Sequence, residues 1–188
     1  APELETEQAA MQWALQEAQF SVPLLEQRSD SALVDVALLF RTGAIADPPG
    51  KAGLAALTAA MITDGGSRLR TREQLQKALY PLAQVDKEML RFGGTVHRDN
   101  LEAWWAIVHE MLTDPGFRAE DFARIRQQQV NAVRDSLRAN NDEELGKELL
   151  YEQVYGDAHP YGRLTLGHAG DLESITLDDV RRFYRTQL

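Results

Sequence analysis

The alternation of apolar and polar positions changes its period several times along the chain, and each change predicts a different element. Residues 33–40 (L-V-D-V-A-L-L-F) are rich in β-forming side chains and apolar on nearly both faces, which predicts a central strand. Residues 22–28 predict a short edge strand, because Pro23 has no amide hydrogen to donate to a neighbouring strand. Two further strands are expected at residues 84–90 and 91–97.

Other segments carry the 3.6-residue period of amphipathic helices or the residues that begin and end helices. Thr71 with Gln74, and Asn141 with Glu144, have the spacing of a capping box, and Thr176 can cap the last helix. Helices are therefore expected at residues 1–20 (a helix or arm), 53–63, 71–82, 101–112, 119–138, 142–156 and 177 onward.

Strands and helices are mixed without the strict alternation of a doubly wound fold. The fold class expected is α+β, with a mixed or antiparallel sheet packed against several helices. The sequence contains no internal repeat and no change of composition that would mark a linker, so residues 1–188 are interpreted as a single domain.

Composition narrows the function classes. The net charge of −9, from 29 acidic and 20 basic residues, disfavours a nucleic-acid partner. The chain has no run of 18 apolar residues, so it contains no transmembrane helix, and without cysteine it has no thiol chemistry. It begins Ala1-Pro2 without an initiator methionine, which a cleaved signal or simple trimming would explain. The compartment stays unknown, with a periplasmic or secreted location slightly favoured.

The four histidines show no metal-binding spacing, since no two lie three or four residues apart. His109 is expected to flank the core beside the Trp104-Trp105 stripe. His97, His159 and His168 could serve an unrelated active site, but the sequence identifies no partner for them. The acidic runs 142–144 and 178–179 are explained by their places in the first turns of predicted helices, where the helix dipole favours negative charge.

Two stretches of the chain are recognisable in their order: residues 40–55 (F-R-T-G-A-I-A-D-P-P-G-K-A-G-L-A), and residues 155–167 (Y-G-D-A-H-P-Y-G-R-L-T-L-G) followed by 174–185 (S-I-T-L-D-D-V-R-R-F-Y-R). The order of these pieces resembles the pitrilysin/insulinase family of zinc metallopeptidases. The first stretch resembles the strand, loop and helix start that precede the family's H-x-x-E-H motif, and the second resembles its H-P-Y-G region and the helix after it. The resemblance covers about residue 22 to the end.

The resemblance places the H-x-x-E-H positions on Ala56, Ala59 and Ala60, where active members carry two zinc ligands and a general base. Alignment on V-N-A at residues 130–132 places the third ligand on Val133 and a supporting acid on Arg126. The catalytic motif is therefore expected to be degenerate, with no catalytic residue, no metal ligand and no cofactor.

On a helical wheel the three alanines share one side, and the opposite, core-facing side carries Leu54, Leu57 and Met61. Val133 projects among Phe122, Ile125 and Leu137, so it can be a core residue without any metal.

The resemblance implies a catalytically inactive homologue, namely the non-catalytic subunit that completes the peptide chamber of a heteromeric zinc metallopeptidase. The expected partners are a zinc-bearing homologous subunit or a further domain, together with a peptide substrate. The alternative is a structural or peptide-binding protein with no protease partner. The chain ends directly after a helix, where the family repeat normally continues, so it is expected to be a fragment of a longer two-domain chain.

Overall fold

The computed structural model describes residues 30–75, 81–136, 142–156 and 158–188. The chain divides into two compact units, Ala1–Ser31 and Ala32–Leu188, and every helix and strand described below belongs to the second. The helix or arm expected at residues 1–20 and the strand expected at 22–28 lie outside the described residues.

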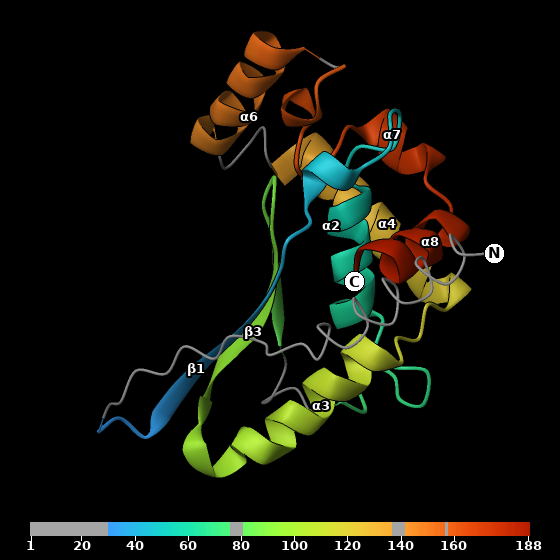
Figure 1. The fold of residues 1–188 in the computed structure, drawn as a ribbon. Helices are drawn as coiled ribbons and strands as arrows, with labels where there is room; N and C mark the ends of the chain where they lie inside the picture. The colour runs from blue at the N-terminus through green and yellow to red at the C-terminus, as the bar shows by residue number, and fades with distance from the viewer. Residues whose placement is uncertain (1–29, 76–80, 137–141, 157) are drawn as a thin grey trace, which may run out of the picture. The chain divides into compact units, whose positions relative to one another are not determined.

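Three antiparallel strands form the sheet in the order β1–β3–β2, with bounds β1 Leu33–Phe40, β2 Leu82–Val85 and β3 Leu90–His97. β3 lies in the middle of the sheet (Figure 1). Its Gly93 pairs with Ala37 of β1 on one side and with Leu82 of β2 on the other. A Cβ atom on Gly93 would lie 2.3 Å from the main-chain oxygen of Val36, so glycine is required where the strands approach. The α+β class is confirmed.

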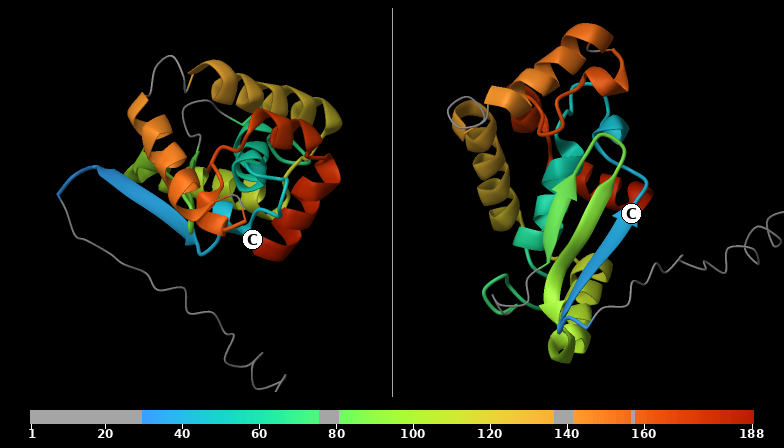
Figure 2. Two further views of the ribbon diagram at one scale, coloured as in Figure 1. Left: turned by 90° about the horizontal axis from the view of Figure 1, so that it is seen from above. Right: turned by 90° about the vertical axis from the view of Figure 1, so that its left-hand side faces the viewer.

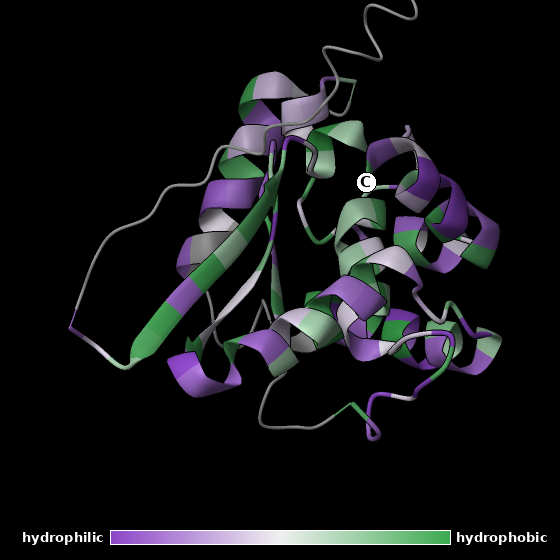
Figure 3. Cartoon of the chain, turned by 60° about the horizontal axis from the view of Figure 1, so that its bottom comes forward, coloured by the Kyte–Doolittle hydropathy of each residue, from purple (hydrophilic) through white to green (hydrophobic). Residues whose placement is uncertain are grey.

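β1 was predicted as a central strand, and it is not central in the sheet that the described residues form. The strand lies at the edge of the described sheet, and its side chains alternate between half-buried and exposed. Its apolar run continues onto the open face, where Leu33 is 57% and Leu39 is 60% exposed. In Figure 3 the apolar colour accordingly extends along most of β1. An apolar run on both faces was therefore a poor guide to burial here.

The helices lie on one side of the sheet (Figures 1 and 2). Their bounds are α2 Leu54–Asp64, α3 Leu101–Thr113, α4 Ala119–Asn131, α6 Asp142–Tyr155, α7 Ala169–Ser174 and α8 Leu177–Gln187. Short turns of 3₁₀ helix are η1 Ala44–Ala46, η3 Arg98–Asn100 and η5 Pro160–Gly162, and η4 Ala132–Ser136 is a π-helical continuation of α4. The helices predicted at 53–63, 101–112, 119–138, 142–156 and after Thr176 are confirmed to within a few residues.

The helix predicted at residues 71–82 is not borne out in its described part. Residues 71–75 form a single turn, in which Leu75 donates to the main-chain oxygen of Thr71 over 3.1 Å. The side chain of Gln74 accepts a hydrogen bond of 2.8 Å from the Thr71 amide, so half of the capping box is present but closes only this turn. Leu82 already belongs to β2.

The core surrounds α2, which packs against β2, α4 and α8. It is built from side chains of every layer, including Leu57, Met61, Phe92, Ile125, Val180 and Phe183. A second, smaller cluster joins β3 to α3 through Val96, Trp104 and Val108. None of the described helices is long and apolar enough to cross a bilayer.

Candidate functional site

Asp47 caps the start of helix α2. It lies six residues before Gly53, the N-cap residue of that helix. The carboxylate accepts hydrogen bonds of 2.8 Å from the amides of Gly53 and Ala55. Pro48 and Pro49 end regular structure between them, and Gly53 takes a left-handed conformation with φ of 90°. Burial raises the pKa of Asp47 from its ordinary 3.8 to about 7, although the two amide hydrogen bonds and the nearby charge of Arg163 act to lower it.

The segment after the H-P-Y-G sequence lies against this same helix start. Arg163 donates to the main-chain oxygen of Asp47. A Cβ atom on Gly167, which has φ of 84°, would lie 2.1 Å from the main-chain oxygen of Ala52. Gln129 of α4 donates to the oxygens of Gly53 (3.1 Å) and Leu166 (2.9 Å). The two stretches that carry the family resemblance, more than a hundred residues apart, therefore meet at the start of α2.

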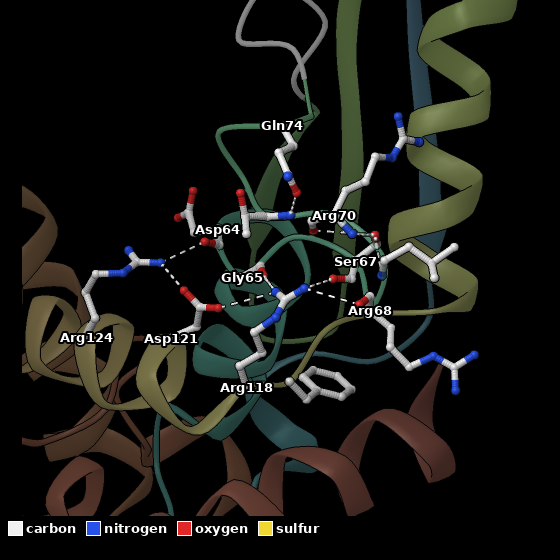
Figure 4. A network of polar contacts seen from close by, with 12 residues as sticks. Asp64, Gly65, Ser67, Arg68, Arg70, Gln74, Arg118, Asp121 and Arg124 are labelled. Atoms are coloured by element: carbon white, nitrogen blue, oxygen red, sulfur yellow. Dashed lines mark hydrogen bonds and ion pairs between the residues drawn. The ribbon is translucent and has the colours of Figure 1, made fainter.

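Two arginines hold the C-terminal end of α2 (Figure 4). Arg118 lies directly before α4, and Arg124 lies within α4. The guanidinium of Arg118 donates to the main-chain oxygens of Gly65 (2.9 Å) and Ser67 (2.6 Å). Arg124 donates to the main-chain oxygen of Asp64 over 2.9 Å, and both arginines pair with Asp121. These contacts satisfy carbonyl groups that a helix end leaves without partners. Both ends of α2 are thus fixed by polar contacts.

A second group of contacts fixes the loop that follows α2. Glu110 of α3 accepts hydrogen bonds from the hydroxyl of Ser67 and the guanidinium of Arg70. The hydrogen bond from Arg70 lowers the pKa of Glu110 and raises that of Arg70. The polar groups of Figure 4 therefore pair with one another and hold the helix; they form no free set of catalytic groups.

The three positions at which the resemblance places the H-x-x-E-H motif lie in or at the edge of the interior. Ala56 is 5% exposed and Ala59 is 1% exposed, while Ala60 is half-buried. The two-sided picture of this helix was therefore incomplete: Leu54, Leu57 and Met61 do face the core, but the opposite side is covered as well. Neighbouring elements on several sides leave α2 no open face, and alanine's small side chain suits such close packing.

The two positions on the next helix are also structural. Val133 lies in the π-helical segment η4 and packs, half-buried, against the core. Phe122 and Ile125 are buried as projected, and Leu137 lies outside the described residues. Arg126 donates to the main-chain oxygens of Glu173 (3.3 Å) and Ile175 (3.1 Å) and stacks over the Phe122 ring at 5.1 Å. At the position where the resemblance places a supporting acid, the chain therefore has a cation that connects α4 to the end of α7.

These residues do not fit a zinc ion. Alanine and valine carry no nitrogen, oxygen or sulfur donor in their side chains, and zinc needs at least three such protein ligands. Among the described residues, no group of three or more histidine, cysteine, aspartate or glutamate side chains could hold a metal ion.

The histidines are exposed, and three of them make local contacts. His97 and His159 each accept a hydrogen bond at Nδ1 from the amide two residues ahead, at 3.3 and 3.2 Å. His168 lies 3.1 Å from the carboxylate of Glu152. The prediction for His109 was wrong: Trp104, Ile107 and Val108 fill the core side of α3, and His109 lies on its exposed side.

Comparison with solved structures identifies the class of fold. The chain superposes with a TM-score of 0.71 on the inactive domain of a peptidase M16 from Pseudomonas fluorescens, with 24% identity over 84% of this chain and 39% of that one. A protease from Helicobacter pylori gives 0.69, with 18% identity over 84% and 38% of the two chains. The periplasmic protease PqqL of Escherichia coli gives 0.67, with 14% identity over 83% and 18%.

The fold is therefore that of the peptidase M16, or pitrilysin/insulinase, domains, which confirms at the level of the fold what the sequence motifs resemble. The chain spans less than half the length of each of these three proteins. No protein-family model matches the sequence, and no curated protein matches it either.

Proposed function

We propose that this chain is a catalytically inactive domain of the pitrilysin/insulinase type, and that it serves as the non-catalytic subunit that completes the peptide chamber of a heteromeric zinc metallopeptidase. The observation that carries the proposal is the state of α2. The helix is held at both ends by polar contacts, yet the positions on which the resemblance places the motif are Ala56, Ala59 and Ala60.

The chemistry of the missing ligands supports an inactive role. Structural zinc sites contribute about 10–16 kcal/mol of binding in small peptides, and methyl groups supply none of it. Without zinc, no bound water has its pKa lowered toward ~7, the step on which metallopeptidases depend. The likeness to a domain described as inactive supports the same conclusion.

The proposed partner is a homologous subunit or further domain with an intact H-x-x-E-H motif, and the proposed ligand is a peptide. A periplasmic location is proposed as well, supported by the periplasmic PqqL among the structural neighbours. A longer, two-domain parent chain is proposed on the ground that all three neighbours extend well beyond the region matched here.

Reconstitution tests the proposal. The chain is purified alone, the H-x-x-E-H homologue encoded in the same genome is purified alone, and cleavage of a fluorogenic peptide library is measured for each and for the mixture. The expected result is no cleavage and no stoichiometric zinc for this chain alone, with cleavage appearing or rising in the mixture. Glu→Gln in the partner's motif, which should abolish that cleavage, is the control.

Two outcomes contradict the proposal. Zinc-dependent cleavage by the purified chain alone would show that it has an active site of its own. A mixture that forms no complex and gains no activity would favour the alternative, a structural or peptide-binding protein without a protease partner.

A further inference from the structure

Helix α6 carries its apolar side chains on the outside. Among the α6 side chains that the structure describes, none is buried, and Glu148 and Glu152 are the two that are half-buried. Five large apolar side chains of the same helix are exposed: Leu149, Leu150, Tyr151, Val154 and Tyr155. A surface helix of a soluble domain normally does the opposite and packs its apolar stripe on the core. The described part of α6 therefore gains little stability from apolar packing.

The core of the domain is built without the described side chains of α6. Neither the main core cluster nor the smaller cluster around Trp104 includes any of them. By contrast, α8 contributes Val180 and Phe183 to the main cluster. In Figure 1, α6 lies at the margin of its unit, and its main neighbour among the described elements is η5. Elements with few buried apolar contacts open locally at a lower free energy than the core does.

The two half-buried glutamates supply the contacts that hold α6. Lys87, in the turn between β2 and β3, donates to the carboxylate of Glu148 over 2.7 Å. The same carboxylate accepts from the amide (3.0 Å) and the hydroxyl (2.8 Å) of Thr165. One turn further along the helix, Glu152 lies 3.1 Å from Nε2 of His168. These five residues are called the α6 latch below.

The C-terminal end of α6 is held by rings instead of charges. The Tyr155 ring stacks on Tyr151 at 5.8 Å and on His159 at 5.0 Å, and Tyr161 lies 5.6 Å from Tyr155. These contacts join the end of α6 to η5 and involve no member of the latch. This end can therefore stay in place when the latch opens.

The latch and the core respond differently to salt. The pair of Lys87 and Glu148 is partly open to solvent, with 26% of the Glu148 side chain exposed. Salt weakens such a pair by screening its charges, since the Debye length falls to about 3 Å at 1 M. Sodium chloride does not weaken apolar packing in this way. Conditions that open the latch should therefore leave the core intact.

We propose that α6 is a releasable arm: the latch holds it against the domain, and it swings away about its C-terminal tyrosines while the core stays folded. The inference goes beyond the proposed function and does not rest on it, because it concerns a motion of this chain alone. Its test needs no partner, so its failure would leave the proposed function standing.

Thiol labelling tests the arm, since the chain has no cysteine of its own. Thr165→Cys places a thiol beside Glu148, at a position that is 9% exposed. Thr58→Cys places the same group inside α2, where Thr58 is 0% exposed, and reports opening of the core. The rate of reaction with a small disulfide reagent is measured for each thiol at low salt and in about 1 M NaCl. Each rate is divided by that of the same chain unfolded in urea.

Two lysine variants are combined with each thiol. Lys87→Met removes the cation of the latch. Lys147→Met is the matched control, because the printed ion pair of Lys147, 2.8 Å to Glu143, lies within α6 itself. Loss of a nearby cation by itself raises the pKa of a thiol and slows its reaction. Faster labelling in Lys87→Met therefore reports release of the arm. Circular dichroism checks that each variant is folded.

The thiol at position 165 is expected to react about a hundredfold faster than the thiol at position 58. Lys87→Met should speed the reaction at position 165 about tenfold, and salt should speed it severalfold, with little change at position 58. Lys147→Met should stay within about twofold of its parent.

Two results would overturn the inference. Equal rates at the two positions would show that α6 leaves the domain only when the core unfolds. A rate at position 165 that responds to neither Lys87→Met nor salt would show that the latch does not hold the arm. The salt series uses Thr165→Cys alone, so it decides the question even if Lys87→Met does not fold.

Discussion

Gln129 of α4 donates a hydrogen bond of 3.1 Å from its side-chain amide to the main-chain oxygen of Gly53, at the start of α2. The same amide nitrogen donates to the main-chain oxygen of Leu166 over 2.9 Å, and Gln129 is buried. One side chain thus connects the start of α2, the helix α4 and the segment after H-P-Y-G. Polar contacts of this kind hold together the region in which the resemblance places the H-x-x-E-H motif.

Gln129→Leu should reduce the free energy of unfolding by about 2 kcal/mol, because the carbonyl groups of Gly53 and Leu166 lose their buried donor. Urea denaturation at pH 7 measures the change. Gln127→Leu is the matched control: Gln127 is exposed on the same helix and bonds within that helix, to Asn131 at 2.9 Å. Equal losses for the two variants would show that the bridge from Gln129 contributes nothing.

Asp47 should make stability depend on pH near neutrality. Its pKa is raised to about 7, chiefly by burial, so the folded state retains a proton that the unfolded state has released above about pH 4. This contribution to stability is fully present below about pH 4 and is lost as pH rises through about 7. Urea denaturation from pH 4.5 to 8 should show the decline in wild type and a smaller decline in Asp47→Asn.

Asp47→Ala supplies the second arm of that experiment. It removes the side chain that accepts from Gly53 and Ala55, so it should cost about 1–2 kcal/mol at pH 4.5, as other lost helix caps do. The difference from wild type should shrink as pH rises toward 8, because the variant also lacks the carboxyl group that titrates. Parallel pH profiles for wild type and Asp47→Asn would contradict the assignment of the raised pKa.

Local signals along the chain predicted the helices well, because capping residues and the 3.6-residue period act within a few positions. Thr176 is the clearest case: its capping box forms with Asp179 as the third residue of α8. The same local signal failed at Thr71, where the hydrogen bond to Gln74 closes a single turn and Leu82 pairs with Gly93 in the sheet. Long-range pairing decided that segment, and no local pattern reports it.

Burial could not be predicted from apolar character alone. Leu39 is in an apolar strand but faces away from the helices, and His109 lies beside an apolar stripe but on its exposed side. Asp47 was missed as a structural residue, although an acid six positions before a helix start, followed by two prolines, was a usable signal. Gln129 carried no such signal, because its partners lie 76 and 37 residues away in sequence.

The interior around Ala59 should reject the side chains that zinc would need. Ala59 is 1% exposed, so Ala59→Glu should lower the free energy of unfolding by about 3 kcal/mol or more, through overpacking and a buried unpaired charge. Ala60→Glu places the same group on the half-buried side and should cost much less. Urea denaturation with and without added zinc measures both, and a stable, zinc-binding Ala59→Glu variant would contradict the closed packing of α2.

Asp179 should account for part of the acid sensitivity of the protein. Burial raises its pKa, but hydrogen bonds from Thr176 and Lys51 outweigh that effect and lower it from 3.8 to about 2. The folded state therefore favours the ionised carboxylate, and this stabilisation is present above about pH 4 and is lost as pH falls toward 2.

Asp178 is the control, because it lies beside Asp179 in the same first turn with its side chain 86% exposed. Urea denaturation between pH 5 and 2.5 measures the effect. Asp179→Asn should be about 1 kcal/mol less stable than wild type at pH 7 and should lose less stability on acidification. Asp178→Asn should follow the wild-type profile. Identical acid profiles for the Asp179 and Asp178 variants would show that the capping box carries none of this pH dependence.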